Sequence, residues 1–323
     1  SISNISMNYL QIWERRKRNG ATHWQNNFPI PTPRHMGRSL HQHHNTKRGN
    51  HVLQPTKDWD DAFANMAHIA GSEALPGLWA DNAAAYRASG VNIEEDIAYG
   101  DHPREKFDLI WPDGTPKGVV VFIHGGFWMR LDKSFWSDLA EGARANGWAV
   151  CLPSYTLAPE ARIHQMTAQI GAAITKVSAR VAGPIKLSGH SAGGHLAARM
   201  VSSTSPLSTN ILERINHTLS ISGLHDLRPL LHTKMNDILR LDDTEAHAES
   251  AALLRPITTA PVTGWVGGGE RPEFIRQTEL LAQMWSGLDA QIVSAIDGQH
   301  NHFTVIEGLS DPKSAITTAL LET

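Results

Sequence analysis

Short apolar runs recur along the chain from residue 106 onward, and they constrain its fold more than any other feature. The run 119–123 (VVVFI) is continuous and β-branched, which is typical of a strand buried on both faces of a parallel sheet. Further strand-like runs occupy residues 106–111, 148–152, 185–187, 219–221, 262–266 and 292–296. Helix-length segments lie among them at 162–181, 195–202, 272–285 and 315–321, after helical pieces over 58–90 that Gly71 and Pro76 break. This alternation predicts one α/β domain with a mostly parallel central sheet and helices on both faces.

The first 57 residues differ from the rest in charge. They hold nine Lys or Arg and one acid, a net charge of +8 in a chain whose total is −3, and six of its 18 histidines. No helical or strand periodicity persists there, and prolines interrupt it. We therefore predict a basic, His-rich, poorly structured extension over 1–57 and a catalytic domain over 58–323. A polyanion-binding arm or a metal-binding tract is the alternative for the extension, although no fixed ligand spacing appears.

Composition excludes several classes of protein. Hydrophobic residues make up 41% and charged residues 19%, as in ordinary globular proteins, and no run approaches 18 apolar residues. No charged-then-apolar signal peptide is recognisable at the N-terminus. Cys151 is the only cysteine, which excludes an intrachain disulfide and a Cys-based zinc site. We expect a cytoplasmic protein with neither nucleic acid nor membrane as partner, and the sequence leaves a homo-oligomeric state open.

A serine follows the run 185–187 in a pattern of catalytic type. Gly189-x-Ser191-x-Gly193 lies between a predicted strand and a predicted helix, which is the context of a nucleophile elbow. The residues two before and two after the serine must be small, because the backbone crosses closely at this turn. The turn exposes the hydroxyl, and the helix that follows presents backbone N–H groups and a positive dipole end.

An earlier strand end carries a second signal of the same chemistry. The run 119–123 continues into His124-Gly-Gly-Phe-Trp128, where adjacent glycines let the backbone curl so that its amides face one point. An oxyanion hole is predicted from the amides of four residues: Gly125, Gly126, Phe127 and Ala192. His124 is expected to fix the loop by hydrogen bonding.

A histidine late in the chain and an acid before it would complete a triad in the order serine, acid, histidine. His300 and His302 both follow the last strand, and spacing alone does not separate them. Glu270 is the acid directly at the end of the preceding strand, where it would accept the Nδ1–H of the histidine. The alternatives for the acid are Asp297, Glu273 and, after an earlier strand, Asp226.

These segments together resemble a known family. GHSAGGH around Ser191, HGGFW at 124–128 and YTLAPE at 155–160 resemble the α/β-hydrolase esterases of the hormone-sensitive-lipase type. The HGGFW form, with PEFIRQ at 272–277 and NHF at 301–303, is more similar to the kynurenine formamidase (arylformamidase) branch.

The resemblance covers roughly residues 58–320 and implies the α/β-hydrolase fold. In that family the catalytic histidine directly precedes a phenylalanine, which implies His302 rather than His300. Glu270 matches the acid of some members, whereas this chain has Gly269 where others carry an aspartate.

The resemblance and the motifs imply a serine hydrolase that cleaves small carboxylic esters or aryl-formamides. Ser191, His302 and Glu270 would form the triad and an acyl-enzyme, with no metal or organic cofactor. The partner would then be a small-molecule ester or amide substrate. The alternative is a catalytically silent hydrolase fold that serves as a binding module, although all three triad positions are occupied.

Aromatic residues near these motifs suggest a substrate pocket. Trp128 and Tyr155 are assigned to it, with Phe127 and Trp136 as further candidates. Residues 226–237 are expected to cover the site, where Leu227, Leu230 and Leu231 would contact substrate.

Overall fold

The computed structural model describes residues 57–322, so the predictions for residues 1–56 lie outside the described part of the chain. Its strands are β1 (Ile93–Ala98), β2 (Lys106–Ile110), β3 (Val119–Ile123), β4 (Ala149–Pro153), β5 (Ile185–His190), β6 (Ile215–Ile221), β7 (Val262–Gly267) and β8 (Ile292–Asp297). The α-helices are α2 (Trp59–Phe63), α3 (Leu75–Arg87), α4 (Glu141–Ala145), α5 (Ile163–Ser178), α6 (Ala192–Arg199), α7 (Thr209–Leu212), α8 (Asn236–Leu239), α9 (Asp243–Ala248), α10 (Pro272–Ser286) and α11 (Ala315–Leu321). Short 3₁₀ turns are η1 (Met66–His68), η2 (Ser72–Ala74), η3 (Lys133–Phe135), η4 (Ser137–Ala140), η5 (Arg228–His232), η6 (Ala251–Leu253) and η7 (Thr304–Ser310).

All of these strands join one sheet, in the order β1-β2-β4-β3-β5-β6-β7-β8. The pairs β1–β2 and β2–β4 are antiparallel, and every pair from β4 to β8 is parallel. The predicted mostly parallel sheet is therefore confirmed. Because parallel strands end at the same edge, the loops after β3, β5, β7 and β8 converge on one side of the sheet.

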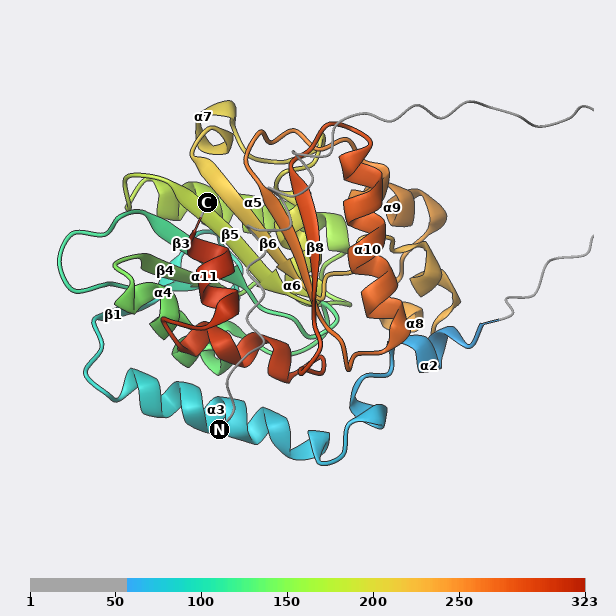
Figure 1. The fold of residues 1–323 in the computed structure, drawn as a ribbon, viewed down its shortest axis with the longest axis horizontal. Coiled ribbons are helices and arrows are strands. Elements are labelled where there is room, and N and C mark those ends of the chain that lie inside the picture. The colour runs from blue at the N-terminus through green and yellow to red at the C-terminus, as the bar shows by residue number, and fades with distance from the viewer. Residues whose placement is uncertain (1–56, 323) are drawn as a thin grey trace, which may run out of the picture. The chain divides into compact units, whose positions relative to one another are not determined.

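Helices cover both faces of the sheet, and alternate residues of the central strand show how. Val119, Val121 and Ile123 pack into one apolar cluster together with side chains of α5, α6 and α10. Val120 and Phe122 point the other way, into a cluster with α4 and α11. Figure 1 shows α11 and α4 against the sheet and α3 running below its lower end. The period of two in a strand is what gives β3 two buried faces.

The sequence analysis missed β1. Its burial alternates irregularly, with Glu94 paired to Leu109 and a register shift before Ile97, so it carries no clean apolar pattern. No helix between residues 57 and 322 has both the length and the apolar character needed to cross a membrane.

Candidate active site

Ser191 lies in the sharp turn between β5 and α6, with φ of 55° and ψ of −116°. Its neighbours show why this turn demands glycine. A Cβ on Gly189 would lie 2.2 Å from the carbonyl oxygen of Gly193, and a Cβ on Gly193 would lie 1.9 Å from that of Ile123. The Ser191 amide donates to the Ile221 carbonyl at 2.8 Å, which fixes the turn against β6. The strained backbone is thus held by close packing on two neighbouring strands.

The loop after β3 curls around this serine. A Cβ built on Gly125 would lie 2.9 Å from the His190 carbonyl oxygen and 3.1 Å from the Cβ of Ser191, so a larger residue would force the loop away from the serine. Gly126 and Phe127 have φ of 112° and 52°, and their amides donate no backbone hydrogen bond to any residue between 57 and 322. Ala192 is the first residue of α6, where an amide has no intrahelical acceptor. These free amides near the serine are donors of the kind an oxyanion requires.

His124 supports the loop from behind. Its Nδ1 lies 2.7 Å from the Gly125 carbonyl oxygen, and its ring stacks on Tyr155 at a centroid distance of 4.5 Å. Burial lowers the pKa of His124 to about 4, so the ring is neutral at pH 7.

His302 and Glu270 meet at the ends of β8 and β7. Nδ1 of His302 lies 2.6 Å from Oε2 of Glu270, and both side chains are buried. The other carboxylate oxygen accepts the Gly267 amide at 2.8 Å and the Ser222 hydroxyl at 2.5 Å. Glu270 is therefore held on three sides, and it can orient the imidazole and stabilise its charged form.

The alternatives for the histidine and the acid lie apart from this pair. Asp297 lies 3.8 Å from His300, and His300 contacts Thr304 through Nδ1. Glu273 is paired with Lys57 and Arg276, and Asp226 with Arg228.

His190 fixes the backbone of the loop that carries His302, which we call the histidine loop. Its Nε2 lies 2.8 Å from the carbonyl oxygen of His302, and the two rings are 4.6 Å apart. Burial and the neighbouring His302 keep the pKa of His190 well below its usual range. A neutral ring has one N–H, and it must be at Nε2 for this contact to be a hydrogen bond.

A cavity of about 440 Å³ opens over Ser191 and His302. Gly125, Gly126 and Phe127 line it beside the serine. Its other aromatic walls are Phe63, Trp79, Trp136 and Phe303. The predicted nucleophile, histidine and oxyanion loop thus border one largely apolar cavity.

Known proteins share this architecture. The profile of a family described by its alpha/beta hydrolase fold matches residues 120–258. A crystal structure of a protein provisionally named a thioesterase, from Silicibacter sp., is 46% identical, with a TM-score of 0.77 over 81% of this chain and 98% of that chain. The chain belongs to the α/β-hydrolase family. A kynurenine formamidase of Danio rerio is 29% identical to this hydrolase over 237 residues, covering 70% of this chain and 80% of that protein. An esterase B from Lactobacillus rhamnosis, solved with an inhibitor, shares its fold with a TM-score of 0.59 at 17% identity over 77% of this chain and 92% of that chain.

Two aromatic residues that the sequence analysis assigned to the pocket of this α/β hydrolase lie elsewhere. Trp128 is fully buried against His195, with ring centroids 5.2 Å apart, and Tyr155 is fully buried with its hydroxyl donating to the His124 carbonyl oxygen at 3.1 Å. Neither residue is among those that line the cavity. Both pack on the core side of the predicted oxyanion loop, residues 124–128, whereas Phe127 and Trp136 do face the cavity.

The expected cover over residues 226–237 contributes less than predicted. Leu227 and Leu230 are buried in the core and Leu231 packs against it, and none of the three lines the cavity. Met235 is the lining residue of this segment.

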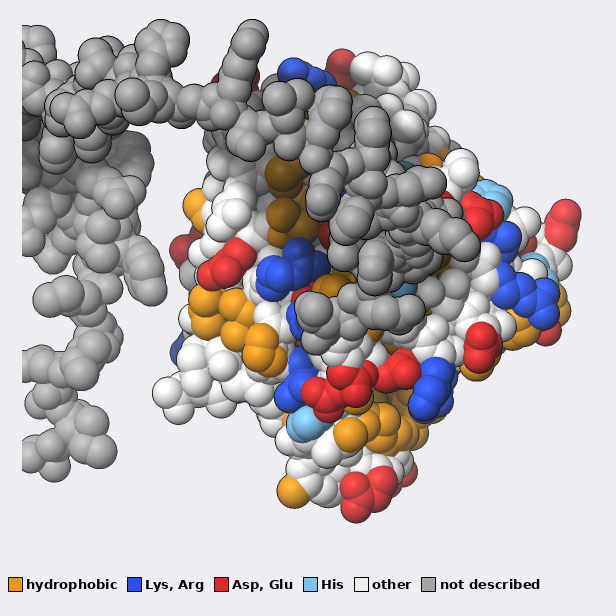
Figure 2. Space-filling model, turned by 90° about the vertical axis from the view of Figure 1, so that its right-hand side faces the viewer, with side chains coloured by type: hydrophobic (Ala, Val, Ile, Leu, Met, Phe, Trp, Pro, Cys, Tyr) orange, Lys and Arg blue, Asp and Glu red, His pale blue; other side chains and the backbone are white. Residues whose placement is uncertain are grey.

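Residues 57–68, which we call the α2 wall, close one side of the cavity in this hydrolase, and the sequence analysis did not place them there. Five consecutive positions, 63–67, line the cavity together with Asp60. Ionic contacts attach the wall to the body: Lys57 to Glu273 at 2.6 Å, Asp61 to Arg271, and Asp60 to the Lys234 amide at 2.7 Å. Figure 2 shows acidic and basic side chains next to one another on the side of the molecule that α10 occupies in Figure 1. Acidic residues at the N-cap and in the first turn of a short helix, Asp58, Asp60 and Asp61, were the available signal.

No cluster of three or more His, Cys, Asp or Glu side chains suited to a metal ion occurs within residues 57–322.

Proposed function

We propose that this α/β hydrolase is a serine hydrolase that cleaves small carboxylic esters or aryl-formamides through Ser191, His302 and Glu270. The observation that carries the proposal is the 2.6 Å contact between His302 Nδ1 and Glu270, with Ser191 and His302 bordering the same cavity. A buried carboxylate on Nδ1 leaves Nε2 of the histidine to act toward the serine.

In the first half of the reaction, His302 removes the Ser191 proton as the hydroxyl oxygen attacks the substrate carbonyl carbon. The resulting oxyanion is held by the amide of Ala192 and those of the Gly125–Phe127 loop. Because the loop is already curled and its amides are free, little reorganisation is needed at this step. His302 then protonates the leaving alcohol or amine, and an acyl-enzyme remains.

Water completes the reaction. His302 removes a proton from a water molecule that attacks the acyl carbon, and the second tetrahedral intermediate collapses with the proton returned to Ser191. Glu270 accepts the Nδ1–H of His302 and stabilises the imidazolium that forms twice per turnover.

The choice of substrate rests on the cavity and on the relatives. Aromatic side chains form much of the cavity, which suits an aromatic leaving group. A relative is named a kynurenine formamidase, whose name denotes an aryl-formamide substrate, and other relatives are named methylesterases. We infer a small-molecule partner and a cytoplasmic setting; Cys151 is buried and unpaired, as in proteins that do not rely on disulfides.

The test compares hydrolysis of N-formylkynurenine with that of p-nitrophenyl acetate and butyrate and of a short acyl thioester. Replacement of the nucleophile by Ser191→Ala should lower kcat on every substrate by on the order of 10⁴-fold or more. A much larger kcat/KM for the formamide would support the arylformamidase form of the proposal, and turnover of esters alone would support the carboxylesterase form.

Silence of the wild-type protein on all of these substrates would favour the binding-module alternative. Unchanged turnover in Ser191→Ala would show that Ser191 is not the nucleophile.

A further inference from the structure

The cavity over Ser191 is mostly apolar, and few of its lining residues could recognise a polar substrate group. Apart from the proposed catalytic groups and His190, they are Asp60, Asn65, Arg130 and the indole nitrogens of Trp79 and Trp136. Asp60 already has partners, because it accepts the Lys234 amide and lies 3.9 Å from the Lys234 ammonium. The two that stand out are Asn65, on the α2 wall, and Arg130, on the oxyanion loop.

Asn65 is a buried amide without a partner. Its side chain is 3% exposed, and neither Oδ1 nor Nδ2 has a hydrogen-bond partner among the described residues. Leaving such a group unsatisfied in an apolar site is unfavourable, and native proteins rarely keep one without a reason. Because Asn65 lines the same cavity as Ser191, a substrate group can supply the missing hydrogen bonds.

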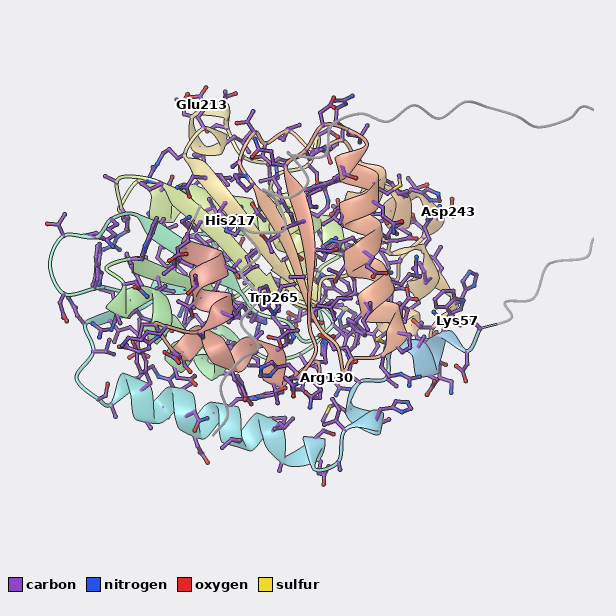
Figure 3. All side chains as sticks on the ribbon, viewed as in Figure 1. Lys57, Arg130, Glu213, His217, Asp243 and Trp265 are labelled. Atoms are coloured by element: carbon purple, nitrogen blue, oxygen red, sulfur yellow. The ribbon has the colours of Figure 1, made fainter. Side chains whose placement is uncertain are left out.

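Arg130 is an exposed cation at the rim of this cavity. Its amide donates to the Gly126 carbonyl at 3.0 Å, so its backbone is fixed to the loop beside Ser191. No carboxylate within residues 57–322 lies within ion-pair distance of its guanidinium. Figure 3 shows Arg130 below the lower ends of the strands.

We propose that Arg130 and Asn65 bind the leaving-group part of the substrate, and that this part carries a carboxylate. The proposal rests on the function proposed above: a small acyl group offers nothing polar besides the reacting carbonyl, so recognition must act on the leaving group. A guanidinium matches a carboxylate in a bidentate geometry, and the Asn65 amide matches a neutral donor or acceptor on the same molecule. The substrate class is therefore an acyl ester or formamide of an aromatic acid.

The test uses two esters that differ only in this charge, 4-acetoxybenzoate and methyl 4-acetoxybenzoate. Arg130→Met should lower kcat/KM for the carboxylate substrate by about 10- to 100-fold, mainly through KM, and change the methyl ester less than twofold. Arg130→Lys should recover part of the loss. Arg255→Met is the matched control, since Arg255 is also exposed but lies outside the cavity lining, and it should leave both substrates unchanged.

Asn65→Leu separates recognition from a structural role. Removing a buried, unpartnered amide should leave Tm unchanged or raise it, while kcat/KM for both esters falls by about 10-fold. A large drop in Tm would overturn the role of Asn65 in recognition.

Binding of the product 4-hydroxybenzoate, measured by titration calorimetry, tests recognition of the carboxylate by Arg130 independently of turnover. Binding that weakens at least 10-fold in Arg130→Met, and not in Arg255→Met, supports the proposal even if neither ester is cleaved. In Arg130→Met, an equal loss of kcat/KM for 4-acetoxybenzoate and its methyl ester, or unchanged binding of 4-hydroxybenzoate, overturns it while leaving the proposed hydrolysis intact.

Discussion

Ser222 shows how a single residue outside the proposed triad can set its geometry. It follows β6 directly, with φ of 51°, and its amide donates to the Trp265 carbonyl at 2.7 Å. Its hydroxyl then reaches Glu270, whose other oxygen contacts His302. A serine one residue past a strand end is common, so nothing in the sequence singled it out.

Ser222→Ala should lower kcat by about 10-fold with little change in KM, because Glu270 loses one of the donors that hold it. Alanine has the same small Cβ at this φ, so the variant should fold with a Tm close to that of the wild type. Steady-state kinetics and thermal unfolding measure the two effects. Ser310→Ala, an exposed serine that bonds only to the Glu307 carbonyl, is the control. An unchanged kcat would mean that the two remaining contacts suffice to place Glu270.

The glycines of this chain differ in how much room their surroundings leave for an added Cβ atom. Gly193→Ala would place a methyl group against the Ile123 carbonyl, and the backbone at the elbow cannot yield without moving β3. We expect a loss of about 3 kcal/mol or more in the free energy of unfolding, or failure to fold. Gly77→Ala is the matched control: Gly77 lies in α3 with no atom near its added Cβ, and the change should stabilise by about 0.5–1 kcal/mol. Urea unfolding of both variants tests this, and equal stabilities would contradict the packing argument.

At the scale of elements, the α2 wall is attached to the body through a few polar contacts and through Phe63, which packs on Phe274 of α10 with ring centroids 6.0 Å apart, rather than through a strand. Arg271→Met removes the contact with Asp61 while Lys57 still reaches Glu273. Exposed ion pairs contribute little to stability, roughly 0.2–1 kcal/mol, so Tm should fall by no more than a few degrees. KM should rise severalfold, because the wall lines the cavity. A KM unchanged at low and high salt would show that the wall stays in place without this contact.

The elements that the sequence predicted well are those whose pattern reflects burial on both faces. The strand 119–123 was located at its true bounds, and the parallel sheet followed from its neighbours. β1 was missed because it is half exposed and bulged, and α6 begins at Ala192 rather than at the predicted 195 because the elbow leads directly into the helix.

The proposed catalytic residues could be predicted from motifs, since each lies shortly after a strand whose apolar run is recognisable in the sequence. The residues that line the pocket could not be predicted in this way. Phe127 and Trp128 both have positive φ, and their side chains point in different directions, one to the cavity and one to the core. The α2 wall reaches the site through tertiary contacts, among them those with Arg271, Glu273, Lys234 and Phe274, and no local pattern encodes these.

At the scale of the whole molecule, buried neutral histidines set the response to acid. Burial lowers the pKa to about 4 for His124 and His217 and to about 3 for His195 and His225, and it holds that of His190 well below its usual range. In the unfolded chain these rings titrate near 6.5, so the unfolded state binds more protons as the pH falls below that value. Stability is therefore fully present above about pH 6.5 and is lost progressively toward pH 4.

Each of the four histidines with a pKa of about 3 to 4 should remove about 2 kcal/mol of stability at pH 5, and together they approach the whole free energy of unfolding of a typical domain. We expect acid unfolding with a midpoint between about pH 4 and 5.5. Urea titrations monitored by tryptophan fluorescence from pH 8 to 4.5 measure the slope. A free energy of unfolding that stays flat from pH 7 to 5 would show that these rings are not buried in neutral form.

The cavity draws its walls from Asp60 at one end of the described chain to Phe303 near the other. During synthesis the α2 wall therefore leaves the ribosome long before the histidine loop, roughly 10 to 50 s earlier at ordinary elongation rates. In that interval Phe63 and its neighbours have no partner surface on α10, and they are exposed to chaperones and to self-association. Hydrolytic activity consequently requires that synthesis has passed the loop that carries His302, because the cavity and the proposed triad are incomplete before then.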